Sequence, residues 1–315
     1  YPNEYYRDRS KVKLSKQTYR FMDDMQARLA AYKTGELDVI GTAPYYALEE
    51  YAGTGEIYSA APLTSLYSLF NLQAEVLKDP RVREALVISI DRQDLCSVMG
   101  DDHVPSPGLV SVNMPSVAED GKMFAETAPA PFEEDAERAR RLLAEAGYPD
   151  GAGFPTLKYI YPNAEEDSNA AQILQSQWKE KLGISVELSA MEQQVYLSER
   201  RAGNFDIARM SWTADFGDPM SHLAMYMSHS LQNDTRIDDP AYDAAVRASD
   251  MEADPARREA LLHEAEAALI GGGFYINPLY AINSNSLVRP GITGMKLDSR
   301  GLYDYRFADV EEVAG

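Results

Sequence analysis

The pattern of hydrophobic and polar positions predicts strands and helices in turn along the middle of the chain. Strands are expected at "LKYIYP", "ISVELSAM" and "FDIARMSW". Helices are expected at "EEDAERARRLLAEAGYPDG", where Gly147 is a stop signal, and at "SNAAQILQSQWKEKLG" and "QVYLSERRAG". This alternation indicates βαβ units with mostly parallel strand pairing.

The N-terminal part shows a similar alternation. "VKLSKQTYRFM" alternates like a strand, "DDMQARLAAYKTG" has helical spacing, "LDVIG" predicts a short buried strand, and "PYYALEEYAG" predicts a short helix. Two longer stretches, 57–73 and 273–291, predict extended chain on either side of a central block of about 200 residues. We therefore expect two lobes, between which the chain crosses and later returns, with a ligand cleft between them.

The remaining patterns complete the central block. "DPRVREALVISIDRQDLCSVMG" predicts an amphipathic helix capped at Asp79-Pro80, with a second helix start in Asp91–Asp94. Residues 101–132 are rich in proline and polar residues and predict a wrapping loop. Further helices are expected at "SHLAMYMS", "PAYDAAVRASD" and "DPARREALLHEAEAALIGG", and the C-terminal tail is strand-like.

Composition narrows the class of protein. A chain of 315 residues favours two lobes, and its formal charge of −20 argues against a nucleic-acid partner, which needs a basic face. No apolar run approaches the roughly 18 residues that span a bilayer. Cys96 is the single cysteine, so no intramolecular disulfide forms, and its apolar helical setting predicts a small core residue.

The stretch "FDIARMSWTADFGDP" holds the candidate chemistry. Asp215 is a turn residue by its local pattern, or a ligand contact, and Asp218 before a proline predicts a helix cap. Arg209 follows a buried strand pattern, so a buried structural ion pair is the alternative to ligand binding. Arg200, beside another arginine on a predicted helix, is either a ligand contact or part of a solvated face.

Metal ligation is the weaker explanation of the histidine and methionine positions. "MSHLAMYMSH" combines Met and His residues that invite a soft-metal site, but Met at helical spacing more often fills core gaps. His103 and His263 are isolated and give no ligand spacing. We expect no metal and no cofactor.

The chain resembles the bacterial extracellular solute-binding proteins of family 5, the oligopeptide-, dipeptide- and nickel-type binding components of ABC importers. The matching stretches, in order, are "PNEYYRDRSKVKL", "AAYKTGELDVI", "DPRVREALVISIDRQDL", "ARRLLAEAGYPDG", "LQSQWKEKLGISVEL", "GNFDIARMSWTADFGDP" and "PLYAINSNSLVRPGITG". The resemblance implies the α/β, periplasmic-binding-protein-like fold (class II, cluster C), a two-lobe clamshell. It places residues 1–65 in part of lobe I, 66–278 in a complete lobe II, and 279–315 in the return to lobe I.

The start of the chain departs from this family. It opens "YPNEYYRDRS", without an initiator Met, an apolar signal region or a lipid-anchor cysteine. Family members carry a long region before this motif, so the resemblance implies a C-terminal fragment of such a protein.

The resemblance also implies roles for individual residues. Asp215 would pair with the α-amino group of a bound peptide, Trp212 would form a wall of the cleft, and Phe216 would contact the ligand. Arg209 and Arg200 would lie near the peptide and meet its carboxylate end when the length of the peptide suits. Family members have an aromatic residue just upstream, where this chain has Gln193.

The function implied is a substrate-binding component of an ABC importer. It would capture short peptides in the interlobe cleft and deliver them to the permease subunits, as a periplasmic protein or a cell-surface lipoprotein. We expect a monomer that performs no catalysis and meets the membrane only through the permease or a lipid anchor. The alternatives are another solute, such as a nickel chelate, a sugar or an opine-like compound, and a hydrolase that uses Asp215 and Asp218.

Overall fold

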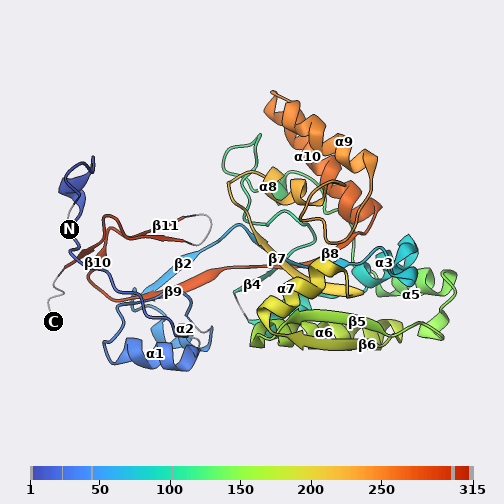
Figure 1. Ribbon diagram of the computed structural model, residues 1–315, viewed down its shortest axis with the longest axis horizontal. Helices are drawn as coiled ribbons and strands as arrows, with labels where there is room; N and C mark the ends of the chain where they lie inside the picture. The colour runs from blue at the N-terminus through green and yellow to red at the C-terminus, as the bar shows by residue number, and fades with distance from the viewer. Residues whose placement is uncertain (1–2, 23, 44, 101, 299–301, 312–315) are drawn as a thin grey trace. The chain divides into compact units, whose positions relative to one another are not determined.

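The structure, a computed structural model, describes residues 3–22, 24–43, 45–100, 102–298 and 302–311 (Figure 1). The chain divides into two compact units. The first, which we call the terminal unit, is made of Tyr1–Pro62 and Asn283–Gly315, and the second, the central unit, is Leu63–Ile282. The predicted lobe II, residues 66–278, lies inside the central unit.

The terminal unit packs two helices against a small antiparallel sheet. The sheet has the order β1-β9-β2, and two further strand pairs, β10-β13 and β11-β12, are also antiparallel. Its core includes Tyr32, Ile40 and Leu287. The elements are α1 (Met25–Lys33), α2 (Tyr45–Tyr51), β1 (Val39–Ile40), β2 (Ile57–Ala60), β9 (Ser284–Val288), β10 (Ile292–Thr293), β11 (Lys296–Leu297), β12 (Tyr303–Asp304) and β13 (Asp309–Val310).

The predicted strand "VKLSKQTYRFM" is wrong, because residues 12–22 belong to no strand. Its aromatic side chains are exposed, with Tyr19 at 67% and Phe21 at 99% of their full accessible area. An alternating pattern becomes a strand only where a neighbouring strand supplies hydrogen bonds and a face to cover. Within the described residues, this segment has no such neighbour.

The central unit is built on one mixed sheet of six strands, in the order β4-β8-β3-β7-β5-β6. The parallel pairing predicted for the three strands of the middle block is confirmed, because β5 pairs in parallel with β6 and β7. The strands from outside this block add antiparallel pairs, β3–β7, β3–β8 and β4–β8, so the sheet as a whole is mixed. Parallel neighbours need crossover connections, which only the helical segments after β5 and β6 provide. The strands are β3 (Thr64–Phe70), β4 (His103–Pro105), β5 (Leu157–Pro162), β6 (Val186–Met191), β7 (Ile207–Thr213) and β8 (Ile276–Ile282).

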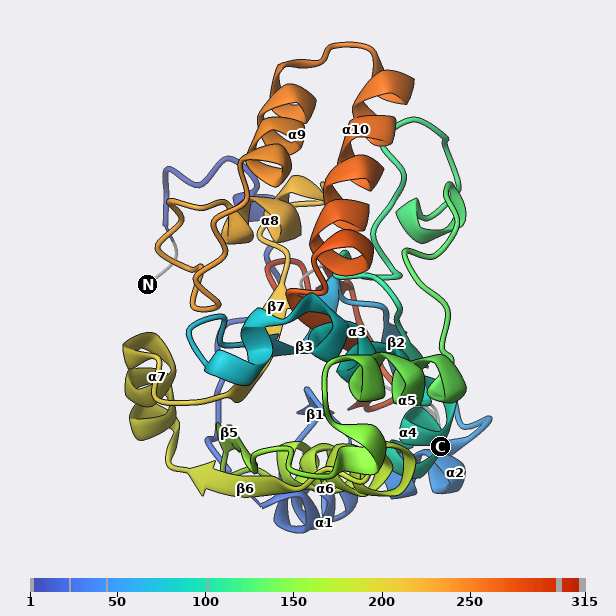
Figure 2. The same cartoon turned by 90° about the vertical axis from the view of Figure 1, so that its right-hand side faces the viewer.

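Helices cover both faces of this sheet (Figure 2). Along β7, Ile207 belongs to one hydrophobic cluster, while Ala208 and Met210 belong to the other, as the two-residue period of a strand requires. The first cluster includes residues of α3 (Pro80–Ile88), α4 (Arg92–Met99), α5 (Ala136–Glu145) and α6 (Glu165–Leu182). The second includes residues of α7 (Gln193–Ala202), α8 (Met220–Leu223), α9 (Pro240–Met251) and α10 (Pro255–Ala267).

Local signals explain where several of these helices begin. Asp79 caps α3 through the Arg81 amide with Pro80 in the first turn, and Asp91 caps α4 through the amide of Asp94, as predicted. Cys96 is buried in α4, and its burial raises the pKa of the thiol to about 12, which confirms a core residue. Among the described helices, none is long and apolar enough to cross a membrane.

Candidate functional site

One edge of the six-stranded sheet carries three of the candidate residues, Trp212, Asp215 and Phe216. Strands β5 and β7 are parallel to each other and end at the same edge. Strand β3, which is antiparallel to β7, and strand β4, which is antiparallel to β8, begin at this edge. Thr64 pairs with Thr213 and His103 with Ile282 at this edge. The turn 214–219 follows β7, and α6 begins after β5. We call residues 64–65, 102–103, 165–167 and 211–218 the candidate edge, because α/β sheets bind ligands beyond the carboxyl ends of their strands.

The turn that carries Asp215 is held from several sides. The backbone N–H of Asp215 donates to Ser221 Oγ over 2.9 Å, and that of Ala214 donates to the Leu63 carbonyl over 2.9 Å. Asp218 accepts from the Met220 amide at the start of α8, as expected of a capping residue. The same carboxylate receives the two arms of Arg258, from α10, at 2.7 and 3.0 Å.

Asp215 and Phe216 are exposed at the tip of this turn. Phe216 keeps 55% of its accessible area. Among the described residues, the Asp215 carboxylate makes no hydrogen bond or ion pair. The turn thus presents a free carboxylate beside an exposed aromatic ring, while the neighbouring Asp218 is fully engaged.

Trp212 lies near the end of β7, on the face of the sheet that carries Met210. Its indole Nε1 is buried and has no hydrogen-bond partner among the described residues. The other tryptophan, Trp178, donates its Nε1–H to the Leu86 carbonyl over 2.9 Å. A buried donor without an acceptor costs about 1–3 kcal/mol, so the Trp212 donor is a group that a ligand could satisfy.

Arg209 lies on the opposite face of β7 from Trp212. Its Nε is 2.5 Å from Oδ1 of Asp167, in the first turn of α6, and its Nη1 donates to Ser211 Oγ over 2.7 Å. Burial raises the pKa of Asp167, whereas for Arg209 the carboxylate outweighs burial and raises the pKa. A buried ion pair, the alternative considered from sequence, is therefore present.

Arg200 is also paired, on the other face of the sheet. Its Nε lies 2.9 Å from Oδ2 of Asp234, and the two side chains are 11% and 7% exposed. The guanidinium also stands 5.5 Å from the centre of the Tyr196 ring and donates to Met210 Sδ. The solvated-face alternative for Arg200 is wrong, and the structure separates Arg200 from Arg209.

The sequence pattern missed a second charged group at the candidate edge. His103 lies between Asp102, 2.8 Å from its Nδ1, and Glu166, 3.4 Å from its Nε2. Burial lowers the pKa of His103, but the two carboxylates outweigh it and raise the pKa to about 9. Neither His103 nor Asp167 stands in a recognisable motif, and the acidic run at 165–167 was the only local signal.

The Met- and His-containing stretch forms core structure. His222 is buried in α8 with Ser65 Oγ 3.4 Å from its Nε2, and burial lowers its pKa to about 4. Met225 and Tyr226 are buried in the second hydrophobic cluster of the central unit, the one that also contains Met210. Across the described ranges, no group of three or more His, Cys, Asp or Glu side chains is arranged to hold a metal ion.

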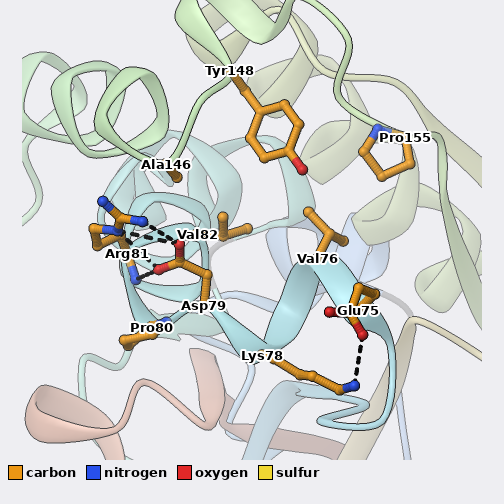
Figure 3. A pocket seen from close by; sticks show the side chains of 10 residues that line it. All are labelled: Glu75, Val76, Lys78, Asp79, Pro80, Arg81, Val82, Ala146, Tyr148 and Pro155. Carbon is orange, nitrogen blue, oxygen red and sulfur yellow. Dashed lines mark hydrogen bonds and ion pairs between the residues drawn. The ribbon is translucent and has the colours of Figure 1, made fainter.

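A pocket also lies at the other edge of the sheet, between the 3₁₀ turn after β3 and the segment before β5 (Figure 3). Its charges satisfy one another: Arg81 pairs with Asp79 and Lys78 with Glu75, both at 2.6 Å. These four groups leave no unmatched charge for a ligand. We therefore place the candidate site at the edge that carries Asp215.

Comparisons with known proteins agree with this fold. Residues 1–234 match the family described as bacterial extracellular solute-binding proteins, family 5 Middle. The chain is 29% identical over 311 residues to the periplasmic murein peptide-binding protein MppA of Escherichia coli. It is 28% identical over 318 residues to the oligopeptide-binding protein OppA of Bacillus subtilis, and 30% over 304 residues to the probable deoxycholate-binding periplasmic protein YgiS of E. coli.

The match extends over almost all of this chain but only part of each relative. These alignments cover 95%, 97% and 96% of the chain and 55%, 57% and 56% of the respective relatives. The solved structure of the E. coli murein tripeptide binding protein MppA superimposes with a TM-score of 0.82 at 26% identity, over 97% of this chain and 60% of that one. The expected α/β fold of periplasmic peptide-binding proteins is confirmed.

Proposed function

Because the chain belongs to the bacterial extracellular solute-binding proteins of family 5, we propose that it captures short peptides for an ABC importer and delivers them to the permease subunits. The names of its relatives support this proposal, since they are named as proteins that bind murein peptides, oligopeptides or dipeptides. Members of this family are substrate-binding proteins rather than enzymes.

The free carboxylate of Asp215 carries the proposal for peptides. It stands exposed at the candidate edge without an ion-pair partner among the described residues, while the nearby Asp218 is matched by Arg258. A peptide brings an ammonium group, and a charge-assisted bond to Asp215 would anchor that end. The peptide backbone also offers carbonyl acceptors whatever its side chains are. The buried Nε1–H of Trp212, a donor without an acceptor among the described residues, would donate to one of these carbonyls. Phe216 would cover the ligand beside this anchor.

Catalysis by Asp215 and Asp218 is disfavoured by the same geometry. A carboxylate pair in glycoside hydrolysis needs one acid and one base or nucleophile, both facing the scissile bond. Asp218 is instead occupied by the arms of Arg258 and by the Met220 amide. A turnover assay with peptides and glycosides is expected to show no product.

A different solute is the second candidate. One relative, 30% identical, is named a probable deoxycholate-binding protein, so similarity at this level spans ligands other than peptides. Mass spectrometry of the ligand carried through native purification separates the two candidates. A bound peptide is the expected result, and a reproducible non-peptide solute would favour the alternative.

The proposal includes an extracytoplasmic setting. Relatives of this chain are named periplasmic proteins, which supports a periplasmic protein or a cell-surface lipoprotein. We propose that it acts as a monomer, makes contact with the membrane through the permease or a lipid anchor, and uses no cofactor.

The direct experiment is calorimetric titration of the full-length protein with tripeptides to pentapeptides, each with a free or an acetylated amino terminus. Free-amine peptides should bind, and acetylation should weaken binding by about tenfold or more, because it removes the charge that Asp215 meets. No binding of any peptide, or equal binding of free and acetylated forms, would contradict the proposal.

A further inference from the structure

The predicted carboxylate-binding arginines are already occupied. Arg209 holds Asp167 at 2.5 Å and Ser211 at 2.7 Å, and Arg200 holds Asp234 at 2.9 Å. Asp167 is 8% exposed and Asp234 is 7% exposed in their side chains. Turning either arginine toward a ligand would leave its partner carboxylate buried and uncompensated, which is strongly unfavourable.

The other cationic groups named at the candidate edge are matched as well. His103 lies between Asp102 and Glu166, and Arg258 forks onto Asp218. Among the charged residues of the candidate edge, Asp215 and Glu165 have no ion-pair partner within the described part of the chain. The surplus charge at the edge is therefore negative, which favours an approaching ammonium and opposes a carboxylate.

We propose that Asp167 is a specificity-determining residue: by occupying Arg209 it makes the site read the amine of a peptide and ignore its terminal carboxylate. This inference rests on the proposed function. The ligand class it defines is short peptides with a free amino terminus, whether their carboxyl end is free, amidated or extended. A conventional site with a free arginine would instead prefer the free acid.

The length of ligand that tests this idea follows from strand geometry. Arg209 lies four residues before the end of β7, at Thr213, and a strand rises roughly 3.3 Å per residue, so Arg209 is about 13 Å from the start of the turn. An extended peptide anchored by its amine at Asp215 would cover that distance with about four residues. Tripeptides to pentapeptides are thus the lengths whose carboxylates could approach Arg209.

The experiment compares matched peptides that differ only at the carboxyl end. The full-length protein is titrated with tripeptides to pentapeptides as free acids and as amides, all with free amino termini. The acid and the amide should bind within about threefold of each other at every length. A preference for the acid of about tenfold or more at any length would overturn the inference.

Two variants test whether Asp167 is the cause of the equal binding of peptide acids and amides. Asp167→Asn releases Arg209 and should make acids bind about tenfold or more tightly than amides at the length that reaches it. Glu166→Gln is the matched control, because it removes the same charge from the adjacent position, beside His103 rather than Arg209. If both variants shift the acid-to-amide ratio equally, bulk charge rather than the occupied arginine is responsible, and the assignment to Asp167 falls. If Asp167→Asn does not fold, the comparison of peptide acids with peptide amides on the wild-type protein still tests the inference.

The outcomes also separate this inference from the proposed function. If no peptide binds, or if acetylation of the amino terminus changes nothing, peptide capture through Asp215 is wrong and the inference falls with it. If free-amine peptides bind and acids clearly exceed amides, peptide capture stands and only the role of Asp167 is wrong.

Discussion

The Nε atom of Arg209 lies 2.5 Å from Oδ1 of Asp167, and this ion pair joins the middle of strand β7 to the first turn of helix α6. The pair gives Arg209 a partner within the protein. Trp212 lies on the other face of the same strand, because side chains alternate between the two faces. Within the described residues, the candidate edge therefore offers a ligand two unmatched acidic groups, Asp215 and Glu165, rather than a set of matched opposite charges.

Replacing Asp215 with Asn should weaken peptide binding. The substitution keeps the size of the side chain and removes the charge, so affinity for free-amine peptides should fall by about tenfold or more. Binding of acetylated peptides should not change. Calorimetry measures both, with Asp120→Asn as the control, because Asp120 is an exposed loop residue elsewhere in the central unit. Equal losses in the two variants would remove Asp215 from the site.

The two tryptophans provide a direct report of where the ligand binds. Trp178 is fully buried and hydrogen-bonded to Leu86, whereas Trp212 is partly exposed with a donor that has no partner among the described residues. Ligand should therefore change the fluorescence of Trp212. In a fluorescence titration, Trp178→Phe should keep the ligand-induced change and Trp212→Phe should lose it. A change that persists in Trp212→Phe would place the ligand elsewhere.

Arg258 should act as a positioning residue for the turn. Arg258→Lys cannot form the fork onto Asp218, so the free energy of unfolding should fall by about 1 kcal/mol and peptide affinity should fall with it. Denaturant unfolding and calorimetry measure the two effects. Arg306→Lys is the matched control, since Arg306 forks onto Asp304 in the terminal unit with 67% of its side chain exposed. Unchanged affinity in Arg258→Lys would mean that the fork does not hold the binding geometry.

Glu266 and Glu259, both on α10, should give opposite pH effects on stability. Burial raises the pKa of Glu266 from 4.5 to about 7, so the folded state binds the extra proton and stability is lost as pH rises from about 4.5 through about 7. Glu266→Gln keeps an acceptor for the Val110 amide, which now donates over 2.8 Å. This variant should unfold at higher denaturant concentration than wild type at pH 8, and its stability should depend less on pH.

Glu259 is the contrasting case. Burial raises its pKa, but hydrogen bonds from Ser116, Val117, Ala118 and other donors outweigh burial and lower the pKa below 4.5. Its contribution to stability is therefore present above pH 4.5 and lost as pH falls. Glu259→Gln should destabilise the protein at neutral pH. The same direction of change in both glutamine variants would contradict this account.

Much of the local structure could be predicted from sequence. A second helix start was predicted in Asp91–Asp94, and α4 begins there at Arg92, with Asp91 as its capping residue. The alternating pattern at 12–22 predicted a strand that does not form, because alternation does not reveal whether a neighbouring strand exists. The two-residue period could have shown that Arg209 and Trp212, three apart in a strand, face opposite sides.

The sequence by itself determined the order of the elements, their family, and the segment that carries Asp215, because these depend on local spacing and on recognisable motifs. Only the tertiary structure decided which charges are free. Asp167, Asp234 and Arg258 come from other elements than the groups they pair with. Such pairing depends on strand order and on which helix covers which face of the sheet. Neither is written in the spacing of residues along one segment, so the unmatched carboxylate of Asp215 emerged only from the folded chain.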